Sequence, residues 1–453
     1  MSAMRAENIG PPAFGDAMKV WLKVGVLGFG GPAAQIALLH RLLVEEKRWI
    51  GESRFLHALN FCMLLPGPEA QQLATYAGWL MHGIRGGLAA GILFVLPGAL
   101  VMLGLSLLYA GFGDISFVRA LFYGVQAAVV AIVIEALMRI GKRALKSTEA
   151  RILAALAFIG IFFFSLPFPL IVFGAAVWGF IRGSEKATQS ATDVTGEDGL
   201  IDRLMAKGAL LHIRPSAFHQ VSIAAICLAA WLVPVALLMF LHAGVFTDIA
   251  RFFSLMAVVT FGGAYAVLAY VAQEAVQSFG WLSPADMLKG LALAETTPGP
   301  LILVTQFVGF LAAFHQAHGM NPYLAGTLGA LLTTWVTFVP CFLWIFAGAP
   351  YAEALRANPR LQNALAAVTA AVVGVILNLA VWFALHVWFG SVADRWFGIL
   401  RLHMPDVATL DIKALLLTLV AAFAILYFRI GLLATLALSG ALGLALLSMN
   451  SIS

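Results

Sequence analysis

The sequence predicts an all-α polytopic membrane protein with two inverted-topology repeats, and three observations lead to this fold class. First, the 453-residue chain is 62% hydrophobic and only 11% charged, whereas roughly a quarter of the residues of a soluble domain are charged. Second, several apolar stretches reach the ~20 residues that a membrane-spanning helix needs. Third, the chain repeats itself. A transmembrane barrel is disfavoured, because its strands would alternate apolar and polar residues.

The long apolar stretches predict at least five membrane-spanning helices. Two further stretches, 152–181 and 412–448, each resemble a pair of shorter helices.

The first 15 residues are polar and contain Gly and Pro, so we expect no signal peptide. The three cysteines are scattered in apolar segments, which favours neither a disulfide framework nor a zinc site. The long spans are expected at residues 88–110 and near Val118, His219, Tyr323 and Leu365.

Two short motifs recur at one fixed offset. Pro66-Gly67-Pro68 returns as Pro298-Gly299-Pro300, and 298 − 66 = 232. At the same offset Phe29-Gly30-Gly31 returns as Phe261-Gly262-Gly263. Further along, Pro97 pairs with Pro340 at an offset of 243, so an insertion of 11 residues is expected near 314–326. Internal duplication of this kind is a common construction of secondary transporters.

The distribution of Lys and Arg predicts that the second repeat is inverted. Five basic residues between 139 and 151 mark a cytoplasmic loop, and the preceding loop 111–116 has none. The equivalent of that outside loop, 348–363, carries Arg356 and Arg360 and should lie inside. The predicted organisation is a first repeat at 1–182, a polar cytoplasmic linker at 183–218, a connecting transmembrane helix at 219–243 and a second, inverted repeat at 244–453.

The Phe-Gly-Gly (FGG) and Pro-Gly-Pro (PGP) motifs predict broken helices inside the membrane. The broken elements can be kinked full spans or re-entrant hairpins, and the sequence leaves both open. Irregular backbone at this depth is tolerated only where protein or water surrounds it. After each break, a helix start offers free N–H groups and the positive end of its dipole, which suits an anion. Four such starts could form an anion cage; close helix packing by glycine is the competing interpretation.

Polar residues near the breaks are the candidates for function. Glu69 and Glu295 adjoin the two PGP motifs and are candidates for proton coupling, for helix capping or for lining an aqueous vestibule. Lys23 and Arg251 precede the FGG motifs and could attract an anion or act as snorkelling anchors. His315 and His318 lack a third ligand nearby, so no metal and no cofactor is expected. The expected substrate-binding residues are Gly30, Gly31, Pro32, Pro66, Gly67, Pro68, Gln71, Gly262, Gly263, Thr296, Thr297, Pro298, Gly299 and Pro300, with Gln72 and Gln306 as further hydrogen-bond donors.

These motifs give the chain a resemblance to a known family. The segments GFGGPAAQIALLHRLLVEEKRWI (28–50), LLPGPEAQQLATYAGWLMHG (64–83) and LFVLPG (93–98) resemble the chromate ion transporter family in its long, two-domain form. In the second half, TFGGAYAVLAYV (260–271) and LAETTPGPLILVTQFVGF (293–310) do so too. Ala264 stands where the first half has Pro32, so the second FGG element need not have the same kink. The resemblance implies a multi-pass inner-membrane protein that exports chromate from the bacterial cytoplasm and confers chromate resistance.

The expected energetics agree with such a transporter. An interior-negative membrane potential drives a dianion outward by ~4.6 kcal/mol per 100 mV, and the chain has no Walker A motif. Proton coupling through a glutamate would be an addition. Three alternatives stay open: a transporter of sulfate or another oxyanion, an anion channel, and a membrane enzyme, although no His, Asp or Cys cluster supports an enzyme. The expected partners are chromate or sulfate, protons and lipid; nucleic acid is not expected, and a homo-oligomer is left open.

Overall fold

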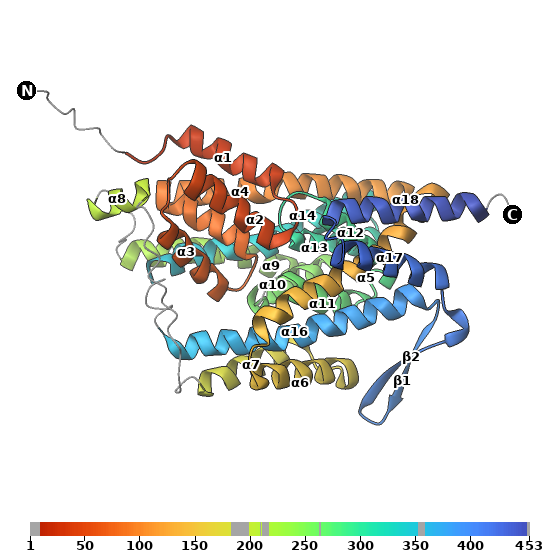
Figure 1. Cartoon of the computed structure of the whole chain (residues 1–453). Helices are drawn as coiled ribbons and strands as arrows, with labels where there is room; N and C mark the ends of the chain where they lie inside the picture. Colours follow the sequence, from red (N-terminus) through yellow and green to blue (C-terminus); the bar gives the residue numbers. More distant parts are fainter. Residues whose placement is uncertain are drawn as a thin grey trace, which may run out of the picture.

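The computed structural model describes residues 10–182, 199–208, 210, 217–261, 264–351 and 358–450. In these ranges the chain is almost entirely helical (Figure 1). The expected long spans are all present as helices long and apolar enough to cross a membrane, and the prediction of an all-α polytopic membrane protein is confirmed. These helices are α4 (Glu69–Phe112), α5 (Ser116–Ala144), α9 (Ala217–Phe240), α14 (Pro322–Gly348) and α16 (Pro359–Trp388).

The order of the elements repeats along the chain. The bounds of α3, shifted by 232, give those of α12, since 52 + 232 = 284 and 64 + 232 = 296. A short π-helix follows the second helix of each half, η1 in the first and η3 in the second. The first half begins with α1 (Phe14–Leu27), α2 (Gly31–His40), η1 (Arg41–Glu46), α3 (Glu52–Leu64) and α4; the second begins with α10 (Val245–Val259), α11 (Ala264–Gln273), η3 (Glu274–Ser278), α12 (Pro284–Thr296), η4 (Leu301–Leu303), α13 (Val304–Gln316) and α14, which η5 (Ala349–Tyr351) follows.

The remaining helices of each half pack on the opposite half. Helix α5 packs against α17 (Ile412–Leu426) and α18 (Leu432–Asn450), and its equivalent α16 packs against α6 (Thr148–Phe164) and α7 (Phe168–Arg182). Small residues allow this: a Cβ on Gly124 would lie 1.9 Å from the Ser439 carbonyl oxygen, and one on Gly374 would lie 2.0 Å from that of Ala154. Helices α5 and α16 also pack on each other and run in opposite directions (Figure 1).

Helix α4 is a helical hairpin rather than a straight rod. His82 and Gly83 leave helical geometry, with φ of −135° and 62°. Beyond them the chain folds back, so that a Cβ on Gly86 would lie 2.2 Å from the Gly78 carbonyl oxygen. In the second half the corresponding arms are separate helices, α13 and α14, and their longer connection at 317–321 is where the insertion was expected.

Each PGP motif therefore joins two short helices. The 13 residues of α3 span about 20 Å, less than the ~30 Å of the hydrocarbon core. The second short helix then reverses into a long one, at His82 in the first half and at 317–321 in the second. This geometry favours re-entrant hairpins over kinked full spans.

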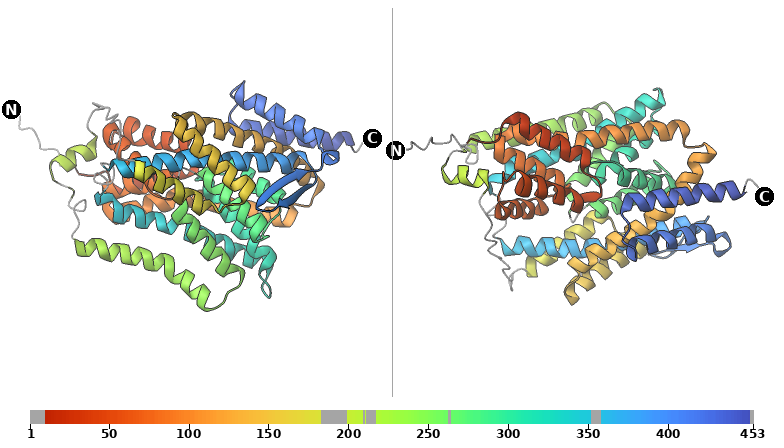
Figure 2. Two further views of the ribbon diagram at one scale, coloured as in Figure 1. Left: turned by 90° about the horizontal axis from the view of Figure 1, so that it is seen from below. Right: turned by 45° about the horizontal axis from the view of Figure 1, so that its top comes forward.

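The linker and the connecting helix lie at the edge of the bundle. Helix α8 (Leu200–Ala206) docks on the start of α3, where the Asp202 carboxylate accepts a hydrogen bond from the Gly51 N–H at 2.8 Å and pairs with Arg54. Helix α9 runs along one edge (Figure 2), and only 11% of the residues in its apolar stretch are buried. Residues 183–198 and 211–216 of the expected linker lie outside the described residues.

A β-hairpin that the sequence analysis did not predict separates α16 from α17. Strand β1 (Val392–Phe397) pairs with β2 (Leu400–Pro405), followed by η6 (Val407–Thr409). The register places Asp394 opposite His403 and Trp396 opposite Arg401. At the equivalent point of the first half, only residues 145–147 separate α5 from α6. The hairpin is thus specific to the second half.

The predicted inversion across the membrane can be tested with single cysteines at exposed positions. We expect Lys146→Cys and Arg360→Cys to be protected from an impermeant thiol reagent in intact cells, because Lys146 lies in the α5–α6 loop and Arg360 in the first turn of α16, which the basic residues place inside. Asp114→Cys and Ile399→Cys should react, and all four should react after permeabilisation. Labelling of Arg360→Cys from outside would contradict the inverted arrangement.

Candidate functional site

Glycine and proline shape the helix breaks in both halves. Gly30, Gly67 and Gly299 have φ values of 88°, 118° and 89°, a region that glycine enters at no steric cost. After each PGP motif the next helix begins at once, with α4 starting after Pro68 and η4 after Pro300. Proline suits this position because it lacks the N–H that a helix start leaves unpaired. The breaks are therefore encoded locally.

The breaks of the two halves bind each other reciprocally. The Gly67 N–H donates to the Thr260 carbonyl oxygen at 2.9 Å, and the Gly299 N–H donates to that of Gly28 at 3.0 Å. Since 28 + 232 = 260 and 67 + 232 = 299, this is one contact made twice. Each PGP segment thus docks beside the FGG motif of the other half. The N–H groups of Gly67 and Gly299, which precede the helix starts, are therefore both paired.

The long helices α4 and α14, each with a proline inside, complete the junction. Gly98 follows Pro97 in α4, and a Cβ on it would lie 2.1 Å from the Pro298 carbonyl oxygen. Its counterpart in α14 is Cys341, since 98 + 243 = 341. The Sγ of Cys341 lies 3.0 Å from where a Cβ on Gly67 would stand. Each PGP segment is therefore held against the opposite half by a long helix as well as by the FGG region.

Backbone donors remain available at the helix starts behind the PGP motifs. The N–H groups of Glu69 and Ala70, and those of Leu301 and Ile302, donate to no acceptor within the described part of the chain. They lie at the positive ends of α4 and of η4–α13, where an anion is favoured. The junction thus offers donor groups from both halves.

Four buried glutamines surround the junction, and most of them brace backbone carbonyls. Gln35, which the sequence analysis missed, donates to the carbonyl oxygens of both Gly28 and Gly299. Gln72 donates to Pro66 and Gln306 to Ala99, at 2.7 and 2.9 Å. The predicted binding residue Gln71 donates instead to the Thr75 hydroxyl at 3.2 Å. The Oε1 atoms of all four are buried without a partner in the described ranges. A single glutamine in the otherwise apolar start of α2 was the signal for Gln35.

The two glutamates occupy different environments. Glu295 is only 4% exposed and accepts a hydrogen bond from the Tyr265 hydroxyl at 2.7 Å, and Arg139 of α5 lies within electrostatic range. Glu69 is half-buried at the first position of α4 and makes no hydrogen bond or ion pair within the described residues. The counterparts of the two are Met63 and Leu301. The junction is therefore symmetric in its backbone but not in its charge.

Several other predicted residues are placed less favourably for binding. Thr296 is exposed and Thr297 buried, and each hydroxyl donates to a carbonyl oxygen three residues earlier. Lys23 and Arg251 are exposed and make no polar contact within the described ranges. Gly262 and Gly263 lie outside the described residues. Helix α11 nevertheless begins at Ala264, so the lack of a proline there does not prevent a helix start.

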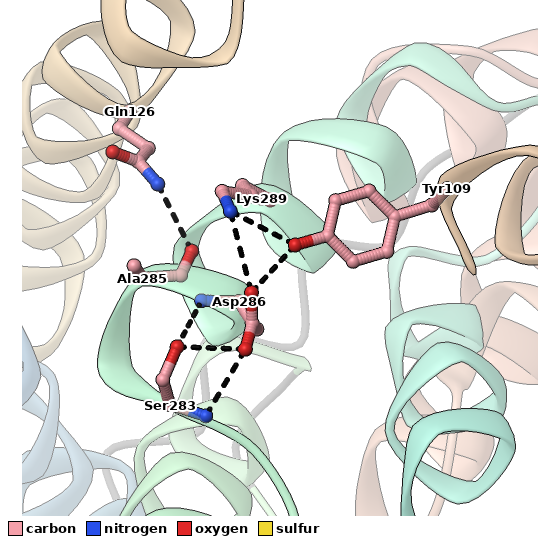
Figure 3. Close-up of polar contacts among 6 residues, drawn as sticks. All are labelled: Tyr109, Gln126, Ser283, Ala285, Asp286 and Lys289. Atoms are coloured by element: carbon pink, nitrogen blue, oxygen red, sulfur yellow. Dashed lines mark hydrogen bonds and ion pairs between the residues drawn. The ribbon is translucent and has the colours of Figure 1, made fainter. Parts of the chain in front are cut away.

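A polar cluster fixes the start of α12, the helix that leads into the second PGP motif (Figure 3). The Tyr109 hydroxyl at the end of α4 donates to Asp286, and Lys289 donates to Tyr109 at 2.8 Å. Ser283 and Asp286 form a capping box, and Gln126 of α5 donates to the Ala285 carbonyl oxygen at 3.0 Å. These residues were not predicted, although a Ser-Pro-x-Asp start is a recognisable capping signal.

Comparison with known proteins gives one consistent result. A family model described as chromate transporter matches residues 15–180 and 247–444. A chromate transport protein of Pseudomonas aeruginosa is 34% identical over 385 residues, which cover 82% of this chain and 81% of that protein. A chromate transport protein of Cupriavidus metallidurans is 26% identical over 373 residues, 80% of this chain and 81% of that protein. No solved structure gives a significant match.

Proposed function

The chain belongs to the chromate transporter family, and from this premise we propose that it is a secondary transporter that exports chromate across the bacterial inner membrane and so confers chromate resistance. The reciprocal docking of the helix breaks is the observation that carries the proposal. It brings helix starts from both halves into one junction between broken helices. Secondary transporters commonly bind substrate at such a place, between repeats and at discontinuous helices.

The chemistry of the junction suits a tetrahedral dianion. Chromate offers four oxygens as acceptors, and the unpaired N–H groups behind both PGP motifs are donors. Each helix dipole contributes about 0.3–2 kcal/mol to binding an anion. The PGP and FGG motifs themselves contain no Lys or Arg, so binding remains weak enough for release, as a carrier requires.

The membrane potential supplies a driving force for export. A dianion that leaves an interior-negative cell gains ~4.6 kcal/mol per 100 mV. Glu69 and Glu295 are the candidates for an additional proton coupling, because carboxylates at this depth are costly unless they serve a function. A coupled proton would make export depend on pH as well as on potential.

Chromate uptake into everted membrane vesicles tests this function. We expect saturable uptake that increases when a potassium diffusion potential makes the vesicle interior positive, since this reproduces the direction of export. Excess sulfate should reduce the uptake if the site recognises the tetrahedral dianion in general. Flux that rises linearly with chromate would instead identify a channel, and vesicles that take up sulfate but no chromate would contradict the proposed substrate.

A further inference from the structure

The two halves differ in how their broken helices pack. Helix α11 packs along α16, and α12 packs on both α5 and α16. The equivalent helices of the first half, α2 and α3, pack on α4 and have no such packing with α5 or α16. Ala269 of α11 is 4% exposed, whereas its counterpart Ala37 of α2 (37 + 232 = 269) is exposed. The broken helices of the second half are therefore closed against α5 and α16, and those of the first half are not.

The β-hairpin is clamped onto the closed half by one arginine. Arg401 donates to the Gln277 side chain of η3 at 2.9 Å and to the Ser165 hydroxyl between α6 and α7 at 3.4 Å. It also pairs with Asp394 and lies 5.8 Å from the centre of the Trp396 ring. The Arg401 side chain is only 13% exposed. One guanidinium thus ties the hairpin, η3 and the α6–α7 turn together.

A small polar cavity lies under this clamp. It has a volume of about 20 Å³ and is lined by Arg401, His403, Gln273, Asn378 and Ala269, among others. This is room for one water molecule and far too little for a tetrahedral oxyanion. The Nε of Arg401 is buried without an acceptor in the described part of the chain. The interface of α11 with α16 is therefore polar at this end, and its cavity is too small for substrate in this state.

We propose that Arg401 is a positioning residue for transport, which holds the second half closed by binding Gln277 of η3, the π-helix that directly follows α11. The first half has no equivalent, because only residues 145–147 stand where the hairpin is inserted. In the alternate state the halves exchange their packing: α11 leaves α16 as α2 closes on α5. The bond from Arg401 to Gln277 must break for this exchange. The inference rests on the proposed transport function but concerns which half is closed.

The rate at which single cysteines react with a thiol reagent reports which half is closed, and it can be measured without any anion. Ala269→Cys and Ala37→Cys are introduced separately, and the protein is purified in nanodiscs so that both faces meet the reagent. The labelling of the native cysteines is subtracted with the parent chain. We expect Ala37→Cys to react and Ala269→Cys to be protected. Arg401→Ala should raise the labelling rate of Ala269→Cys about tenfold, the effect of losing one charge-assisted hydrogen bond.

The same variant should lower the labelling of Ala37→Cys, because closure of one half accompanies opening of the other. Gln277→Ala, which removes the acceptor and leaves the arginine, should act in the same direction. Arg395→Ala, an exposed position on the same hairpin, is the matched control and should change neither rate. An unchanged rate at Ala269→Cys, an equal effect of Arg395→Ala, or a rise at Ala269→Cys without a fall at Ala37→Cys would overturn the proposal. Failure of chromate uptake alone would leave it standing.

Discussion

Replacing Gly98 with alanine should abolish chromate export. The new Cβ would stand 2.1 Å from the Pro298 carbonyl oxygen and 2.7 Å from Leu303 Cδ1. The nearer neighbour is backbone and has no rotamer by which to withdraw, so the second PGP segment must leave its place against α4. Overpacking of this kind typically costs about 1–3 kcal/mol. The displaced segment also includes Gly299, whose N–H binds Gly28, so both the junction and its helix start are lost.

Gly104→Ala is the matched control for this substitution. Gly104 lies in the same helix, and a Cβ there would meet nothing within 4 Å. We expect export by this variant to equal that of the parent, or to increase slightly through the helix preference of alanine. The measurement is chromate accumulation in cells at matched membrane levels of protein. Full export by Gly98→Ala would show that the PGP segment need not dock on α4.

Neutralising Glu295 should reduce export by at least about tenfold while the fold is kept. Glutamine preserves the shape of the side chain and an acceptor for the Tyr265 hydroxyl, so only the charge is removed. Tyr265→Phe should instead destabilise the fold while keeping the charge, because it leaves the buried Glu295 carboxylate without its hydrogen-bond donor. Losing a hydrogen bond to a charged group costs about 1.5–3 kcal/mol, so Tyr265→Phe should lower the thermal stability of the purified protein. The double variant should regain much of that stability but not export.

Two further variants test whether a carboxylate carries a coupled proton or only supports the fold. Asp114→Asn changes an exposed carboxylate in a loop and should leave export unchanged. Glu69→Gln tests the other candidate, which lies at the start of α4 without a partner in the described ranges. If either glutamate carries a coupled proton, its glutamine variant should also lose the pH dependence of vesicle uptake. Wild-type export by both glutamine variants would remove the carboxylates from the mechanism.

The duplicated elements were predictable because each is encoded by short-range signals. Pro66-Gly67-Pro68 ends one helix and starts another through its local backbone preferences. The same motif recurs at residues 298–300, at an ungapped offset of 232, and therefore has the same effect there. Apolar length alone located the long helices. The hairpin of α4 was harder to predict, because its turn at His82-Gly83 depends on close packing between glycines eight residues apart, Gly78 and Gly86.

The contacts between the halves could not be predicted from one sequence. The bond from Gly67 to Thr260 joins residues 193 positions apart (260 − 67), and nothing local at either residue specifies the partner. Gln35 has a polar side chain in an apolar helix, but its acceptor Gly299 comes from the other half. The β-hairpin did leave a signal, since Leu400-Arg401-Leu402-His403 alternates apolar and polar residues directly after the turn residue Gly398. It was hidden by its position between two long apolar segments.

The exchange of packing partners between the halves constrains how the protein is made. When the ribosome has completed Gly67, its acceptor Thr260 has not been synthesised, and Gly28 must likewise wait for Gly299. At about 5–20 residues per second, the 271 residues between Gly28 and Gly299 (299 − 28) take roughly 15–55 seconds to translate. Until then the broken backbone of the first half cannot be left facing lipid. The first half must therefore remain in a watery or protein-lined environment during insertion, and the two halves mature together rather than in succession.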